Sequence, residues 1–175
     1  MKATGIVRRI DELGRIVIPK ELRKNMRIKD GESLEIFLDD DTIVLKKYSP
    51  LESLNLFFKN FVNSINSAIE ENVMIIDRDS IVAVAGDLKK KYLDQSISSE
   101  LDEIIQKREL LCKIDKHNLC LVQGHTENCS HVISPIISNG DVVGAIIVLS
   151  LNRKLDDFDI KTAAIGAKFL GKYIE

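Results

Sequence analysis

The sequence has few cysteines and lacks the long apolar runs of exported or membrane-embedded proteins. Three cysteines in 175 residues are an odd number and too few for a disulfide scaffold, so we expect reduced thiols. No run approaches the roughly 18 apolar residues of a membrane span, and the first residues lack the apolar core of a signal peptide. We therefore expect a cytoplasmic protein with no membrane partner.

The sequence also lacks the motifs of common enzyme classes. It contains no nucleophile elbow, no glycine-rich phosphate loop and no pair of carboxylates at a spacing suited to acid–base catalysis. We therefore do not expect an enzyme, and no cofactor is expected. The second part of the chain is better interpreted as a binding module.

The charge is distributed unevenly along the chain. The net charge is −2, yet residues 1–29 contain nine Lys or Arg and only three Asp or Glu. A basic segment on an otherwise acidic protein indicates contact with a polyanion, while the remainder keeps the protein soluble. Double-stranded DNA is the leading candidate for this partner.

Residues 6–24 combine this basic character with short apolar segments. Residues 6–10 and 15–18 are predicted as strands joined by a turn at 12–14. The second strand contains Ile16, Val17 and Ile18 and leaves no polar face, so it must be covered on both sides. A domain of about 50 residues is near the size at which one chain cannot build an adequate core. We therefore expect a second copy of the chain to supply the cover.

A short helix with one basic face is predicted after Pro19, a residue that suits the first turn of a helix. At about 100° per residue, the basic side chains share one face while Leu22 and Met26 fall opposite. The basic face consists of Lys20, Arg23, Lys24 and Arg27. The helix is thus expected to pack its apolar side against the rest of the domain and to expose its basic side to solvent.

Asp30-Gly31 is expected to end this helix, and a β-hairpin of residues 34–38 and 42–46 is predicted to follow. The turn between its strands contains three adjacent aspartates at 39–41. These carboxylates lack the ligand spacing of calcium loops, so a solvated turn is favoured over a metal site.

A longer motif runs through these predicted elements. It comprises Thr4-Gly5-Ile6-Val7-Arg8-Arg9, Asp11-Glu12-Leu13-Gly14-Arg15-Ile16-Val17-Ile18-Pro19, Glu21-Leu22-Arg23, Leu34-Glu35-Ile36-Phe37 and Leu45-Lys46-Lys47-Tyr48-Ser49-Pro50. These residues resemble the DNA-binding domain of the AbrB-like transition-state regulators. The resemblance implies a dimer in which two chains interleave their strands into one swapped-hairpin β-barrel. It also implies a sequence-specific transcriptional regulator, acting at the nucleoid on sporulation-stage genes as activator or repressor.

The same resemblance implies the DNA contacts. It assigns them to Arg8, Arg15 and Arg23, with Lys24 where a second helix arginine is usual. Lysine keeps the charge at that position but lacks the planar fork of arginine. The basic set that we expect to meet DNA also includes Arg9, Lys20 and Arg27. Because the sequence contains no long recognition helix, the shape and deformability of the DNA are expected to contribute to specificity.

Ser49-Pro50 is predicted to separate a DNA-binding and dimerisation domain, residues 1–50, from a sensory or oligomerisation domain, residues 51–175. Apolar residues then step by three and four along a connector helix, residues 51–71. A terminal helix over residues 156–174, capped by Asp156 or Asp157, has one apolar side with several small residues. These two helices are expected to pack between subunits, so that two dimers form a homotetramer.

The region between these helices has the pattern of an antiparallel sheet. Short strands are predicted over residues 73–77, 81–85, 110–114 and 119–123, with a helix over 99–107. A hairpin of residues 131–138 and 142–151 follows, because Asn139-Gly140 readily adopts a type I′ turn. The order of elements resembles the GAF sensory fold, an antiparallel sheet with flanking helices. The predicted fold class is therefore α+β in two domains.

The GAF resemblance implies a small-molecule effector whose identity the sequence leaves open. Asn152-Arg153 and Phe158 resemble part of the signature of GAF domains that bind cyclic nucleotides. The acidic pair of that signature is missing, since Thr162 stands where its aspartate would follow. A cyclic nucleotide is therefore not expected.

All cysteines and histidines of the chain lie in one region, namely Cys112, His117, Cys120, His125, Cys129 and His131. Zinc ligands usually lie two to four residues apart, whereas seven and eight residues separate these cysteines. We favour ordinary strand and loop residues and predict no metal site. Strand pairing could still bring the six together, so a metal-based or thiol-based sensor is kept as an alternative.

An antitoxin that regulates its own gene is the other alternative, because related swapped-hairpin domains occur in antitoxins. Such proteins usually continue into a disordered toxin-binding tail, whereas the pattern from Leu51 onward predicts an ordered domain. The transcriptional regulator is therefore the favoured interpretation.

Overall fold

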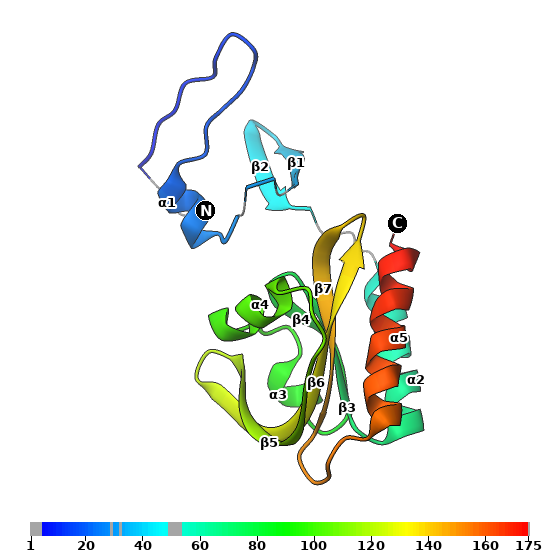
Figure 1. Ribbon diagram of the computed structural model, residues 1–175. Helices are drawn as coiled ribbons and strands as arrows, with labels where there is room; N and C mark the ends of the chain where they lie inside the picture. The colour runs from blue at the N-terminus through cyan, green and yellow to red at the C-terminus, as the bar shows by residue number, and fades with distance from the viewer. Residues whose placement is uncertain (1–4, 29, 32, 49–53, 175) are drawn as a thin grey trace. The chain divides into compact units, whose positions relative to one another are not determined.

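The computed structural model describes residues 5–28, 30–31, 33–48 and 54–174. The chain divides into two compact units, Met1–Tyr48 and Ser49–Glu175, here called the N-terminal and C-terminal units. Both are visible in Figure 1 and are described separately. The predicted boundary at residue 50 and the first residues of the predicted connector helix lie outside the described residues.

The N-terminal unit contains one short helix and one β-hairpin. Helix α1 (Lys20–Asn25) follows Pro19, and strands β1 (Leu34–Asp39) and β2 (Thr42–Lys47) pair antiparallel around a two-residue turn. The predicted helix and hairpin are thus present. Residues 5–18 form an extended ribbon, called the N-terminal ribbon, with a turn at 12–14 and no strand in the single chain. The strands predicted over residues 6–10 and 15–18 are not formed among the described residues of the single chain.

Helix α1 ends earlier than predicted. The Ile28 N–H donates to the Arg23 carbonyl and the Arg27 N–H donates to the Lys24 carbonyl, the two bonds of a Schellman motif. Arg27 accordingly adopts a left-handed conformation, with φ 52°. The prediction that Arg27 lies on the basic face of the helix is therefore wrong, because this residue lies just beyond the helix end.

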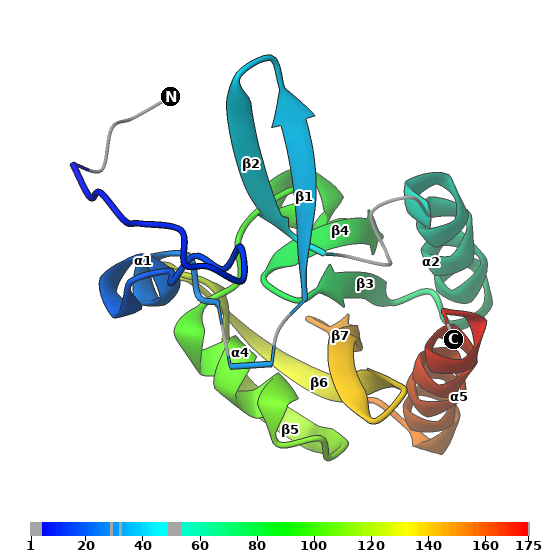
Figure 2. The ribbon, with the colours of Figure 1, turned by 90° about the horizontal axis from the view of Figure 1, so that it is seen from above.

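The C-terminal unit is a five-stranded antiparallel sheet in the order β4-β3-β7-β6-β5. Its strands are β3 (Asn72–Asp77), β4 (Ser80–Ala85), β5 (Leu111–Val122), β6 (His125–Ser138) and β7 (Asp141–Ser150). Its helices are α2 (Asn55–Ile69), α3 (Lys89–Tyr92), α4 (Ser99–Gln106) and α5 (Asp157–Tyr173). Figures 1 and 2 show α2 and α5 on one face of the sheet, and Figure 1 shows α3 and α4 on the opposite face. None of the described helices combines the length and apolar character needed to cross a membrane.

The sheet is buried on both faces. Val73 and Ile75 of β3 pack in the apolar cluster with α2 and α5, whereas Met74 and Ile76 pack in the cluster with α3 and α4. This division follows the alternation of side chains along a strand. A strand covered on both faces reads as a nearly continuous apolar run, and for this reason β3, β4 and β7 were predictable from the sequence.

Strand β5 differs most from its prediction. Residues 111–122 form one strand rather than two, and the pairing with β6 is irregular between Lys113 and His117. β5 lies at the edge of the sheet and its middle is exposed, so its polar residues do not show the pattern of a buried strand. Strand β6 likewise begins at His125, before its apolar run. The hairpin turn agrees with the prediction, since Asn139 and Gly140 have φ 49° and 83°.

Helix α5 is fixed at its start by a reciprocal cap. The Asp156 carboxylate accepts bonds from the N–H groups of Phe158 and Asp159, while the Asp159 carboxylate accepts from the Asp156 N–H. The predicted capping by Asp156 is confirmed. The Arg153 guanidinium donates to both oxygens of Asp159 at 2.7 and 2.9 Å and lies 2.8 Å from Glu71. This network joins the end of α2 to the start of α5.

Close packing of α5 on the sheet leads to a stability prediction. A Cβ on Gly171 would collide with the backbone carbonyl of Ile137, whereas a Cβ on Gly166 would meet the mobile Cδ1 end of Ile146 at 2.8 Å. An alanine in a helix normally stabilises by about 1 kcal/mol over glycine. We expect Gly171→Ala to destabilise the unit by about 1–3 kcal/mol in urea unfolding, because the backbone must shift. Gly166→Ala is the control, and equal stability of the two variants would contradict this packing.

Candidate nucleic-acid interface

The apolar side chains of the N-terminal unit are exposed in the single chain. In the N-terminal ribbon Val7, Leu13 and Val17 are 83%, 75% and 73% exposed, and Leu38 of the hairpin is 80% exposed. Among the described residues of this unit only Pro19 is buried. Both apolar clusters of the described chain lie in the C-terminal unit. The described residues of the N-terminal unit therefore form no core of their own.

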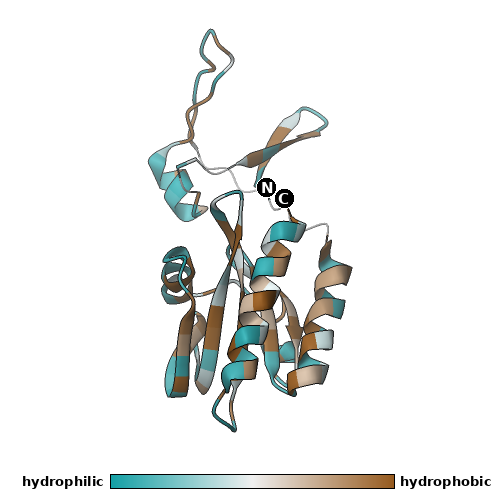
Figure 3. Ribbon diagram, turned by 45° about the vertical axis from the view of Figure 1, so that its right-hand side comes forward, coloured by the Kyte–Doolittle hydropathy of each residue, from teal (hydrophilic) through white to brown (hydrophobic). Residues whose placement is uncertain are grey.

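The hairpin carries apolar side chains on both faces. Its register places Ile36 opposite Leu45 and Leu38 opposite Ile43 on one face. On the other face Phe37 lies opposite Val44, and Lys46 Nζ lies 4.9 Å from the centroid of the Phe37 ring. Figure 3 shows the hydrophobic residues along both hairpin and ribbon. A hairpin of this kind needs cover on both sides to be stable in water.

The three residues predicted for dimerisation lie in the arm of the ribbon that leads to α1. Ile16 and Val17 are exposed, and Ile18 is half-buried next to the buried Pro19. Their side chains thus remain available for contact with another chain.

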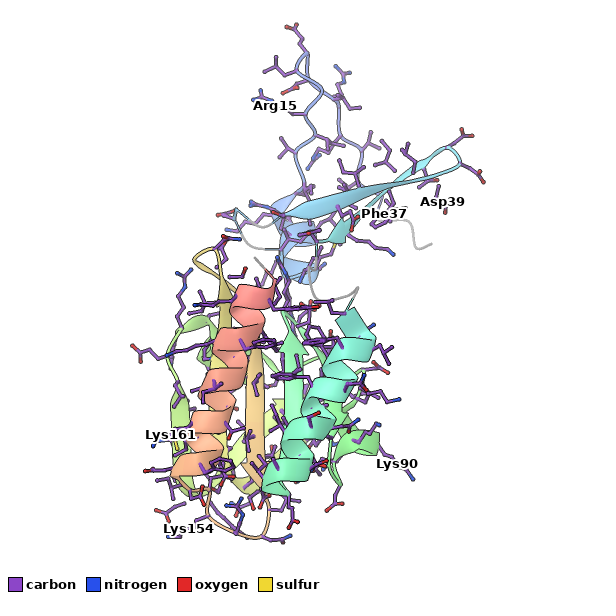
Figure 4. All side chains as sticks on the ribbon, turned by 90° about the vertical axis from the view of Figure 1, so that its right-hand side faces the viewer. Arg15, Phe37, Asp39, Lys90, Lys154 and Lys161 are labelled. Carbon is purple, nitrogen blue, oxygen red and sulfur yellow. The ribbon has the colours of Figure 1, made fainter. Side chains whose placement is uncertain are left out.

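The predicted DNA-contact residues all lie in this same unit. Arg8 and Arg9 are on the first arm of the ribbon, Arg15 follows its turn, and the remainder lie on or just after α1. Six of the seven are exposed, and only Arg23 is half-buried. Figure 4 shows Arg15 close to the turn of the N-terminal ribbon. The structure therefore brings the basic residues and the unpartnered apolar residues together in one unit.

Asp11 organises the turn of the ribbon. Its Oδ1 atom accepts the N–H groups of Leu13 and Arg15 at 3.0 and 2.8 Å, and its Oδ2 atom lies 2.8 Å from Arg15 Nε. Two backbone bonds between Asp11 and the turn, to Gly14 and Arg15, close the loop. The Arg15 N–H and then the Arg15 side chain hold the pKa of Asp11 below its usual value. Asp11 is therefore ionised at neutral pH and paired with Arg15.

A second acidic residue pairs with a predicted DNA contact. Arg23 Nη1 lies 2.6 Å from Asp30 Oδ1, and the Asp30 side chain is otherwise open to solvent. Sequence reasoning missed both acids as parts of the site. The four-residue spacing of Asp11 and Arg15 was the available signal, whereas nothing in the spacing of Arg23 and Asp30 indicated their contact.

The six cysteine and histidine residues are spread along β5 and β6. Pairing places His117 opposite Cys129, and Cys129 Sγ lies 3.7 Å from His131 Nδ1. Within the described parts of the chain, no three His, Cys, Asp or Glu side chains are arranged to hold a metal ion. Burial raises the pKa of Cys129 to about 11, so its thiol is protonated at neutral pH.

One polar cluster of the C-terminal unit was not predicted. The Glu127 Oε1 atom accepts bonds from the Tyr92 hydroxyl and from Lys91 Nζ, both at 2.6 Å. Burial, together with the bond to Glu127, raises the pKa of Tyr92. Residues 89–91 are three consecutive lysines, a pattern typical of a solvated surface, yet Lys91 links α3 to β6. The partner lies 36 residues away, so the contact has no local sequence signal.

Two family models match the chain. Residues 53–175 match the model described as stage V sporulation protein T C-terminal, transcription factor. Residues 7–53 match the model described as antidote-toxin recognition MazE, bacterial antitoxin. The two matches meet near the boundary between the structural units.

Two relatives from Bacillus subtilis extend this result. Stage V sporulation protein T is 42% identical over 177 residues, which cover 100% of this chain and 99% of that protein. The transition state regulatory protein AbrB is 60% identical over 50 residues, which cover 29% of this chain and 52% of that protein. The predicted resemblance to AbrB-like regulators is thereby confirmed.

One solved structure shares the fold of most of the chain. The GAF domain of the nutrient sensor CodY from Clostridium difficile aligns with a TM-score of 0.52 at 14% identity. The alignment covers 89% of this chain and 94% of that domain. At this identity the likeness concerns the fold alone, and it confirms the predicted GAF-like, two-domain α+β class.

The environment of the cysteines leads to a reactivity prediction. Cys129 is buried and its pKa is raised to about 11, whereas Cys120 is half-buried. We expect Cys129 to stay unmodified by iodoacetamide at pH 7.5 in the folded protein and to react readily after unfolding in urea, as followed by peptide mass spectrometry. Cys120 serves as the internal control. Modification of native Cys129 at the rate of a free thiol would contradict the assigned environment and would support a thiol sensor.

Proposed function

Because this chain belongs to the family of the stage V sporulation protein T transcription factors, we propose that it regulates sporulation-stage genes by binding DNA through its N-terminal unit. One observation supports this most strongly. The unit contains the seven predicted DNA-contact residues, six of which are exposed. It also contains apolar elements whose described side chains are not buried in a core. The function is that of a sequence-specific, DNA-binding transcriptional regulator at the nucleoid.

In this proposal two copies of the chain interleave their ribbons and hairpins. Burying one Ile or Val side chain stabilises by about 1.5–3 kcal/mol, and each chain contributes many such residues. Ile16, Val17 and Ile18 lie at the contact, where unpaired strand edges of one copy meet those of the other. The dimer thereby forms a swapped-hairpin barrel that neither chain can form alone.

The same dimer presents two sets of basic residues to the DNA backbone. Arg8, Arg15, Arg23 and Lys24 make the principal contacts, and Arg9, Lys20 and Arg27 add positive charge nearby. Phosphate neutralisation releases counterions, so affinity falls with salt with a log–log slope near −0.9 for each contact. Shape and deformability of the DNA add specificity, because α1 has only six residues and cannot fill a major groove.

We propose that the C-terminal unit joins two dimers into a tetramer and binds an effector whose identity is open. The outer side of α2 and α5 carries a row of stacked aromatic rings. Ring centroids are 4.8 Å apart for Phe57 and Tyr173 and 5.8 Å apart for Phe61 and Phe169. Leu56 and Ile165 on these helices are 72% and 67% exposed. A second copy of the same apolar surface is a fitting partner and would close the assembly by symmetry.

An antitoxin remains the second candidate, favoured by the match of residues 7–53 to the antitoxin model. That match covers the N-terminal segment alone, while residues 54–174 form an ordered sheet and helices rather than a disordered tail. Copurification of a small toxin with the full chain would favour this candidate. The family model that matches residues 53–175 is described as a transcription factor and AbrB as a transition state regulatory protein, which argues against an enzyme.

Dimerisation and DNA binding are expected to depend on different residues of the same ribbon. We expect Ile16→Asp to abolish both, because a carboxylate cannot be buried in the apolar contact. Arg15→Gln should leave a folded dimer whose affinity for duplex DNA falls at least about tenfold and whose salt slope is less steep by about 0.9 for each arginine removed. Light scattering and fluorescence anisotropy across a salt series measure the two effects.

Lys59→Gln on helix α2 is a matched control for the loss of one positive charge outside the N-terminal unit. DNA binding that is independent of salt would contradict the proposed contacts. A monomeric wild-type protein that still binds DNA tightly would contradict the interleaved dimer.

The aromatic surface of α2 and α5 leads to a separate prediction. Ile165→Asp places a charge on this surface and should convert a tetramer into a dimer that is still folded, because Ile165 is not part of the core. Ile114→Asp, at an exposed apolar position on β5, is the control and should leave the mass unchanged. Sedimentation analysis reads the result, and an Ile165→Asp protein of wild-type mass would rule out this interface.

A further inference from the structure

Two of the arginines assigned to DNA contact are held by carboxylates of their own chain. We propose that Asp11 and Asp30 are positioning residues that restrain Arg15 and Arg23 and thereby suppress binding to non-cognate DNA. This inference rests on the proposed function, since it concerns the same basic surface. Asp11 pairs with Arg15 at 2.8 Å, and Asp30 pairs with Arg23 at 2.6 Å.

Each pair has at least one well-exposed side chain and can therefore exchange partners. The side chains of Arg15 and Asp11 are 71% and 42% exposed, and those of Arg23 and Asp30 are 39% and 93% exposed. Exposed ion pairs are weak, so a DNA phosphate can replace the carboxylate. The replacement still has a cost, because the phosphate must displace an ionised acid from its arginine. Every non-cognate encounter bears this cost, whereas a cognate site offsets it with further contacts.

Asp11 has a second role, which a substitution can separate from the first. Its Oδ1 atom holds the N–H groups of Leu13 and Arg15 and so shapes the turn, while its Oδ2 atom holds the Arg15 side chain. Asparagine retains a carbonyl oxygen for the two N–H groups but replaces the other oxygen by an amide that cannot accept from Nε. Asp11→Asn therefore releases Arg15 and keeps the turn, whereas Asp11→Ala removes both interactions.

Asp30 has no such second role within the described part of the chain, because its one described side-chain hydrogen bond is the bond from Arg23. The two acids thus act on two different parts of the basic surface. Asp11 acts at the turn of the ribbon, and Asp30 acts beside α1. Release of either arginine adds a mobile positive charge to the surface. Non-specific binding depends almost entirely on such charges, so it should respond more strongly than specific binding.

The test uses the full chain and two duplexes of equal length. One duplex is enriched by the wild-type protein from a random pool, and the other has a scrambled sequence. Affinities are measured by fluorescence anisotropy over a salt series for Asp11→Asn, Asp30→Asn and Asp40→Asn. Asp40, at the exposed tip of the β1–β2 turn, controls for the same change in net charge. Circular dichroism and light scattering establish that each variant is folded and has the wild-type mass.

We expect Asp11→Asn and Asp30→Asn to strengthen binding to the scrambled duplex by up to about fivefold for each arginine released. The salt slope should steepen by about 0.9 for each additional phosphate contact. Binding to the enriched duplex should improve less, so the specificity ratio falls. In an Arg15→Gln background, Asp11→Asn should have no effect beyond that of Asp40→Asn, because no arginine is left to release.

Three results would contradict this inference or the proposed function on which it rests. If Asp11→Asn and Asp30→Asn match Asp40→Asn on both duplexes, the pairs do not restrain the arginines and the inference is wrong. Weaker binding to the scrambled duplex would overturn it as well. A wild-type protein that binds neither duplex would instead remove the proposed function and this inference with it.

Discussion

The apolar residues described in the N-terminal unit are not buried within the single chain. The proposed dimerisation and DNA binding both depend on this constraint. Val7, Leu13 and Val17 remain mostly exposed, and both faces of the β1–β2 hairpin carry apolar side chains. Leaving each such side chain exposed to water costs about 1.5–3 kcal/mol of free energy relative to burying it. In the proposed dimer another chain covers these residues, and the basic residues of the unit acquire their fixed arrangement through that pairing.

Completion by a partner links assembly to recognition. Arg8 and Arg15 lie on the two arms of the ribbon whose apolar neighbours need cover, so any change that prevents pairing also displaces the arginines. The Asp11 bonds within the turn show that part of this arrangement already exists in the single chain. The C-terminal unit has its own core on both faces of the sheet, while apolar side chains of α2 and α5 such as Leu56 and Ile165 are exposed.

The sequence predicted those features that depend on local pattern. The alternation of residues 34–38, the Asn139-Gly140 turn and the cap at Asp156 each have short-range causes, and the structure contains all three. Features that depend on distant contacts were missed. The extent of β5 was wrong because an exposed edge strand needs no apolar pattern, and the bond from Lys91 to Glu127 joins elements that only the fold brings together. For the candidate site, the basic residues were predictable from composition, but the acids that hold them were found only from the geometry.

The central claim is that the apolar ribbon and hairpin are covered by another copy of the same chain. Isotope-filtered NMR on a mixture of labelled and unlabelled protein tests it directly. Our account predicts nuclear Overhauser effects between methyl groups of Ile16 to Ile18 on one copy and apolar side chains of the N-terminal unit on another. Random-coil methyl shifts for these residues, with no effects between copies at concentrations where the protein is fully folded, would contradict it.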